Sequence, residues 1–306
     1  MNCKLKNNKW FVSAGAVFCC ALWGISTPIV KMGYVYVDAS HVPSLLLWVG
    51  IQFVIAGLLT IGSYSLGSKK IVYPKEKSIK GVVLISLFQT VLQYTLIYVG
   101  LLYTTSVKGA ILKSTDVFFV AIISSLIFKL EKLTWKKVLS CIIGFSGIIV
   151  MNLDGLNLSI NIGDGLVVLG IVFYSFAVVM TKLFARDEDP ITLCGYQMSL
   201  GGVMMFFIGI LGCGKINFVG MLPIILSLSV IYGVSYSLWT VLLKYNQPSR
   251  VTIYSFTTPV FGVIASALFL NEESGVALIN LILALVLVCF GIILWGGEKA
   301  LPKERK

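Results

Sequence analysis

Ten stretches of about 20 apolar residues run through this chain, and they constrain its fold more than any other feature. They cover residues 11–30, 43–65, 81–102, 109–128, 136–153, 164–183, 191–212, 221–243, 250–270 and 275–296. A helix needs roughly 20 consecutive apolar residues to cross a hydrocarbon core about 30 Å thick. Most of the segments between them are too short to hold a soluble domain. The pattern therefore predicts an all-α polytopic membrane protein with ten transmembrane helices in a lipid bilayer.

The charged residues fit this interpretation. They make up 12% of the 306 residues, whereas a soluble protein keeps about a quarter of its residues charged. The net charge is +11, yet 20 of the 24 lysines and arginines fall on one side of the predicted bundle. Cytoplasmic loops carry such an excess of cations. We therefore expect both termini in the cytoplasm, the loops 31–42, 154–162 and 213–220 outside, a multi-pass protein of the cytoplasmic membrane, and no nucleic-acid partner.

An internal repeat relates the two halves of the chain. The segment 106–120 aligns with 249–263, with identical residues that include Thr115 and Thr258. At the same spacing Ser86, Gln89 and Gln93 align with Ser229, Tyr232 and Tyr236, and each triple follows the i, i+3, i+7 pattern of one helix face. A second alignment pairs Trp23 with Tyr174 and Lys31 with Lys182.

The repeat predicts two inverted five-helix units, residues 1–153 and residues 154–306. Units with an odd number of helices must insert in opposite senses. Inverted repeats in transporters place the substrate site at their interface, near the midplane of the bilayer. The predicted organisation is thus typical of an alternating-access carrier.

Several motifs resemble those of the EamA-like family in the drug/metabolite transporter superfamily. They are "ALWGISTPIVKMG" (21–33), "GDGLVVLGIVFYS" (163–175) and "PVFGVIASALFLNEE" (259–273), followed by "CFGIILWGG" (289–297). The first half repeats that ending in "DVFFVAIISSLIFKLEKLTWKKVLSCIIGFSGIIV" (116–150). The resemblance implies a ten-helix carrier of small organic molecules, often an exporter of amino acids or other metabolites. The chain departs from the family at Asp116, which stands opposite Pro259 where a proline is usual.

Lys113 and Asp116 lie inside the apolar block 109–128, which is otherwise typical of a transmembrane helix. A charged residue at the centre of such a helix costs about 2.5–3.5 kcal/mol on insertion scales. On a continuous helix the two would lie one turn apart, so they could form a local ion pair that only holds the bundle together. Alternatively, Asp116 faces a hydrated cavity, where it binds substrate or exchanges a proton. We favour the second interpretation, because intramembrane charges are functional by default.

Aromatic and amide residues at repeat-related positions predict the rest of the site. Their rings can stack on an organic substrate and their polar groups can hydrogen-bond to it. The alternative is that they only join helices to one another. The expected substrate-binding residues are Trp23, Gln89, Gln93, Lys113, Asp116, Tyr174, Tyr232, Tyr236 and Trp239. Pro259, inside the ninth block, is the candidate hinge.

Enzymatic functions find no support in the sequence. The G-x-x-x-x-G-K-[ST] loop, the H-E-x-x-H motif and the G-x-S-x-G elbow are all absent, and His41 is the only histidine. We therefore expect no catalytic residues, no metal and no cofactor. The favoured function is a secondary carrier, operating as a uniporter or by proton exchange, with a homodimer left open. A non-transporting membrane scaffold is the alternative, and a channel is a weaker third.

Overall fold

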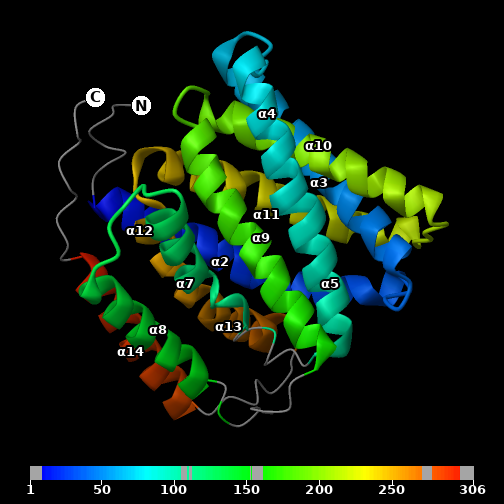
Figure 1. Cartoon of the computed structure of the whole chain (residues 1–306). Coiled ribbons are helices and arrows are strands. Elements are labelled where there is room, and N and C mark those ends of the chain that lie inside the picture. The colour runs from blue at the N-terminus through cyan, green and yellow to red at the C-terminus, as the bar shows by residue number, and fades with distance from the viewer. Residues whose placement is uncertain are drawn as a thin grey trace.

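The structure is a computed structural model that describes residues 9–104, 109, 112–151, 153, 161–270 and 278–296. Helices make up nearly all of the described chain (Figure 1). The helices of the first half are α2 (Lys9–Gly33), α3 (Val42–Ser68), α4 (Glu76–Ile85), α5 (Gln93–Tyr103), α7 (Asp116–Ile122) and α8 (Trp135–Met151). Those of the second half are α9 (Ile162–Phe184), α10 (Pro190–Leu211), α11 (Phe218–Tyr245), α12 (Pro248–Thr252), α13 (Thr258–Leu270) and α14 (Leu278–Gly296). Short 3₁₀ or π segments, η1 (Tyr34–Tyr36), η2 (Ser86–Leu92), η3 (Ile123–Ile127) and η5 (Ile253–Thr257), join or extend them.

Each of the ten predicted spans contains a helical segment among the described residues, but these segments differ in length. Six are long and apolar enough to cross a membrane, and they fall in the first, second, third, sixth, seventh and eighth predicted spans. The described helices in the other four spans are shorter. The multi-pass helical class is thus confirmed, while the count of ten crossings stays a prediction.

The fourth predicted span is not one continuous helix. Lys113 is followed by a turn at Ser114 and Thr115, and α7 begins at Asp116. The turn is closed locally, because the Thr115 hydroxyl and N–H both donate to the Leu112 carbonyl, at 2.6 and 3.0 Å. The expectation that Lys113 and Asp116 sit one turn apart on a single helix is therefore wrong.

The ninth span is interrupted at the corresponding point of the repeat. There the 3₁₀ segment η5 ends at Thr257 and α13 begins at Thr258, the counterpart of Thr115. Asp116 and Pro259 thus occupy equivalent positions in the first turn of a helix. Proline suits that turn because its missing N–H is not needed there, and an acidic residue suits it because the helix dipole is positive there. The break explains how one position accepts such different residues.

Glycines let the major helix pairs approach closely. Along α3 and α10, Gly57 faces Gly195 and Gly50 faces Gly202, so that a Cβ built on Gly202 would lie 2.5 Å from the Val54 nitrogen. In the same way Gly147 of α8 meets α14, and a Cβ there would lie 2.9 Å from the Ala284 carbonyl oxygen. Small residues at the contact are how helices pack in a membrane, where lipid is as apolar as the side chains.

The contacts between helices follow the internal repeat: when each helix is replaced by its counterpart in the other half, the same pairs of helices are in contact. Helix α3 packs on its counterpart α10, and α8 packs on its counterpart α14. Helix α5 packs on α9 just as α11 packs on α2. Hydrogen bonds repeat the relation: Ser86 donates to the Gln197 carbonyl and Ser229 donates to the Gln52 carbonyl, both at 2.9 Å. Each of these serines also donates to the carbonyl four residues before it.

Loops that were predicted on the same side of the membrane lie together. At one end of the bundle the backbone N–H of Lys75 donates to the Glu188 carboxylate at 2.7 Å, and the Lys244 ammonium donates to the Glu188 carbonyl at 2.7 Å. At the other end Val37 forms a β-bridge with Ile216. The first group belongs to the predicted cytoplasmic side and the second to the predicted outer side.

Candidate functional site

Trp23 of α2 occupies the centre of the candidate site. Its indole lies 5.3 Å from the Tyr236 ring and 4.8 Å from the Trp239 ring, measured between ring centroids. It packs against two separate apolar clusters, one containing Tyr232 and Tyr236 and the other containing Tyr174 and Trp239. Five residues predicted from the sequence, drawn from α2, α9 and α11, are therefore brought together.

Tyrosine hydroxyls and rings make up one side of this site. The hydroxyls of Tyr94 and Tyr236 hydrogen-bond to each other at 2.9 Å. Tyr232 donates to the Ser26 hydroxyl at 3.4 Å and stacks on Phe53, with ring centroids 5.5 Å apart. Tyr94 was missed by sequence reasoning, because only Ser86, Gln89 and Gln93 were placed on the functional face of that span.

The reason for the miss is the π segment η2. A π turn contains more residues than an α turn, so the i, i+3, i+7 rule does not hold across Ser86–Leu92. Ser86 faces α10, where it bonds to Gln197. Gln93 begins the regular helix α5 and is buried, with Gln89 buried one turn earlier. The spacing of polar residues thus gave the right helix but not the whole face.

Asp116 borders the other side of the site. It lies one helical turn before Val120 on α7, and residues four apart share a helix face. Val120 packs in the cluster that holds Cys20, Tyr174 and Trp239. Asp116 is 6% exposed, so its carboxylate is buried on the side of α7 that packs against this cluster.

Lys113 is separated from that carboxylate. Its side chain is exposed whereas Asp116 is buried. Both residues are within the described chain, and no ion pair joins them, whereas Lys137 and Glu131 do form one. The interpretation of Lys113 and Asp116 as a local packing pair is therefore wrong.

Four of the predicted site residues carry buried polar atoms without hydrogen-bond partners. These atoms are Nε1 of Trp23 and of Trp239, Oε1 of Gln93 and Oδ1 of Asp116. Such atoms also occur elsewhere among the described residues, for example in Trp48 and Gln52. Most buried polar groups in proteins have a partner, and an unpaired one needs an explanation such as a bound water or ligand. The arrangement is suited to binding an organic molecule that carries both a ring and polar groups.

A buried ion pair at the predicted cytoplasmic end was also missed by sequence reasoning. The Lys137 ammonium donates to the Glu131 carboxylate at 2.6 Å and lies 5.3 Å from the centroid of the Trp295 ring. Glu131 accepts further hydrogen bonds from the hydroxyls of Ser124 and Ser249. The network joins residues of the first half to α12 and α14 of the second.

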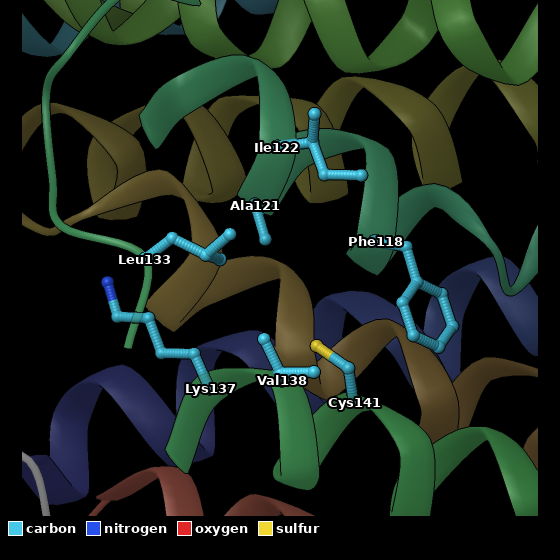
Figure 2. A pocket seen from close by; sticks show the side chains of 7 residues that line it. All are labelled: Phe118, Ala121, Ile122, Leu133, Lys137, Val138 and Cys141. Atoms are coloured by element: carbon cyan, nitrogen blue, oxygen red, sulfur yellow. The ribbon is translucent and has the colours of Figure 1, made fainter. Parts of the chain in front are cut away.

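A cavity of about 160 Å³ lies between α7 and α8, close to this ion pair (Figure 2). It is lined by Phe118, Ala121, Ile122, Leu133, Lys137, Val138 and Cys141. The one charged group there, the Lys137 ammonium, is bonded to Glu131. Because the lining is otherwise apolar and contains none of the predicted site residues, the cavity is a poorer substrate site than the aromatic clusters.

Comparison with known proteins identifies the family. The model of the EamA-like transporter family matches residues 10–153 and 161–296. The chain belongs to the EamA-like transporter family. This confirms the resemblance drawn from the motifs, and it confirms that the protein is a multi-pass membrane transporter and not an enzyme.

Relatives of this EamA-like transporter are similar over most of their length. An uncharacterized transporter of Archaeoglobus fulgidus is 27% identical over 86% of this chain and 91% of its own. The uncharacterized transporter YvbV of Bacillus subtilis is 26% identical over 89% of this chain and 88% of its own. One protein of known crystal structure superimposes with a TM-score of 0.72 at 14% identity, covering 92% of this chain and 96% of its own. That last likeness shows the fold alone.

Proposed function

We propose that this EamA-like transporter is a secondary carrier that exports small organic metabolites across the cytoplasmic membrane by alternating access. The observation that carries the proposal is the aromatic site between the halves. Trp23 of the first half contacts Tyr236 and Trp239 of the second, and the buried indole N–H groups of Trp23 and Trp239 have no hydrogen-bond partner. A scaffold has no use for such atoms, since each unpaired group costs about 1–3 kcal/mol.

Alternating access is supported by the correspondence between the contacts of the two halves, residues 1–153 and 154–306. The matched bonds of Ser86 and Ser229, and the matched helix breaks before Asp116 and Pro259, are those that an inverted repeat produces. In such carriers one repeat rocks against the other around a fixed site. Pro259 adjoins the 3₁₀ segment η5, and we propose this break as a hinge.

Counterflow in proteoliposomes tests the function. Vesicles loaded with one member of a panel of amino acids, amines, sugars and nucleobases should accumulate the same labelled compound against its gradient. Amino acids are in the panel because the family resemblance suggests them. A proton gradient imposed in either direction separates uniport from proton exchange.

Two alanine variants connect the activity to the site. Gln93→Ala and Tyr236→Ala should lose counterflow while still inserting and folding, because Tyr236 lies next to Trp23 and Gln93 carries a buried Oε1 without a hydrogen-bond partner. Tyr73→Ala, which changes an exposed tyrosine outside the helices, is the matched control and should keep the wild-type rate. Wild-type rates in both site variants would remove these residues from the site, and an absence of counterflow with every compound would contradict the carrier.

A further inference from the structure

The charge around the aromatic site limits what the carrier can bind. Asp116 is 6% exposed, its Oδ1 has no hydrogen-bond partner, and it lies one turn before Val120, which packs in the cluster of Tyr174 and Trp239. A carboxylate left in such a place needs a cation or several donors to offset the loss of water. The donors beside the carboxylate, the Ser255 hydroxyl and the Val117 N–H, are both neutral.

The described cations are committed elsewhere or lie outside the site. Lys113 forms no ion pair with Asp116, and the Lys137 ammonium is bonded to Glu131. Lys182 and Lys244 donate to the backbone carbonyls of Lys244 and Glu188 at one end of the bundle. Among these lysines none neutralises Asp116, so the missing positive charge is left for a ligand to supply.

The rings next to Asp116 favour the same kind of ligand. The face of an aromatic ring attracts a cation, most strongly for tryptophan, and clusters of such faces recognise ammonium groups. The Trp23 ring lies 5.3 Å from the Tyr236 ring and 4.8 Å from the Trp239 ring between centroids, and Tyr174 belongs to the same apolar cluster as Trp239. The free indole N–H groups of Trp23 and Trp239 are neutral donors suited to a hydroxyl or carbonyl oxygen.

We propose that the transported molecule is a small organic cation, an amine or quaternary ammonium compound that carries no carboxylate. Its nitrogen lies between the Asp116 carboxylate and the ring faces, and its remaining polar atoms accept from the indoles. A zwitterion or an anion would bring a second carboxylate into a site where the free donors of the described residues are neutral. This inference rests on the proposed carrier function and narrows its substrate class.

Three compounds with one ring and different charge test the proposal on the purified full chain. They are phenethylamine, phenylalanine and 3-phenylpropionate: a cation, a zwitterion and an anion. Quenching of tryptophan fluorescence in nanodiscs reports binding, and counterflow in proteoliposomes reports transport. We expect phenethylamine to bind at least tenfold more tightly than the other two and to be exchanged.

Variants assign the selectivity to Asp116. Asp116→Asn should weaken phenethylamine binding at least tenfold, whereas Asp116→Glu, which keeps the charge, should retain most of it. Asp38→Asn, which neutralises an exposed aspartate in a loop, is the matched control and should bind like the wild type. If Asp116→Asn fails to fold, the three compounds on the wild-type protein still decide the matter.

The outcomes separate this inference from the proposed function. Equal or tighter binding of phenylalanine, or unchanged amine binding by folded Asp116→Asn, overturns the inference. Counterflow of a zwitterion or a sugar without counterflow of the amine also overturns it and leaves the carrier in place. If no compound of the wider panel binds or is exchanged, both proposals fail.

Discussion

At the scale of single residues, the most distinctive interaction is the buried pair of Glu131 and Lys137, whose side chains are 0% and 4% exposed. Removing one partner of a buried pair typically costs about 3–5 kcal/mol, because the other charge is left unpaired, whereas replacing both is often neutral. We therefore expect Lys137→Met to lower the melting temperature of the protein clearly. The double variant Glu131→Gln, Lys137→Met should recover most of the loss. Tryptophan fluorescence of the protein in detergent, followed during heating, measures the melting temperatures. An equal decrease in melting temperature in the single and double variants would contradict the prediction.

The sequence could predict the aromatic residues of the site but not this ion pair. Trp23, Tyr174, Tyr232, Tyr236 and Trp239 lie within apolar blocks, where a ring at a repeat-related position stands out. Glu131 and Lys137 lie in and beside a basic loop, and such charges are normally solvated. Nothing in the periodicity of a loop shows that it folds back to bury a charge against Ser249 and Trp295.

At the scale of helices, the closest packing is that of α3 against α10, and it depends on glycines. A Cβ on Gly57 would lie 2.6 Å from both the Gly195 carbonyl oxygen and the Ser199 nitrogen, so a helix backbone would have to move. Overpacking of this kind costs about 1–3 kcal/mol. Gly57→Ala should therefore lower the melting temperature.

Gly62, on the same helix, gives a matched control. A Cβ there meets nothing within 4 Å, and alanine is the better helix former by about 1 kcal/mol. We expect Gly62→Ala to keep or raise the melting temperature. If both variants behave alike, the contact between α3 and α10 is looser than the structure shows.

Helix interruptions were the part of the fold that hydropathy could not predict. Apolar blocks locate the segments because burial in lipid depends on composition over about 20 residues. The break before Asp116 comes at Ser114 and Thr115, and neither they nor the π segments η2 (SLFQTVL) and η3 (ISSLI) contain a glycine or a proline. These local changes depend on packing against other helices, which a single segment does not encode.

At the scale of the whole molecule, the repeat accounts for both the site and the arrangement of the loops. In the repeat, α5 corresponds to α11 and α9 corresponds to α2, and the packing of α5 on α9 matches that of α11 on α2. These four helices carry Gln93, Tyr236, Tyr174 and Trp23. Residues from both halves, among them Trp23, Tyr174 and Tyr236, therefore pack together in the candidate site, as the repeat in the sequence predicts.

Orientation in the membrane is the remaining prediction for the whole molecule, and it rests on the 20 of 24 cations that fall on one side. The structure brings Lys75, Glu188 and Lys244 together at one end and residues 37 and 216 together at the other, so labelling one position at each end decides the matter. Ser40 and Lys70 are both exposed and belong to opposite ends.

In a variant without native cysteines, a membrane-impermeant maleimide applied to intact cells should label Ser40→Cys and leave Lys70→Cys unmodified. Permeabilised cells should label both, which controls for reactivity. Labelling of Lys70→Cys alone would invert the proposed orientation, and labelling of both in intact cells would rule out opposite sides for these loops and with it the predicted topology.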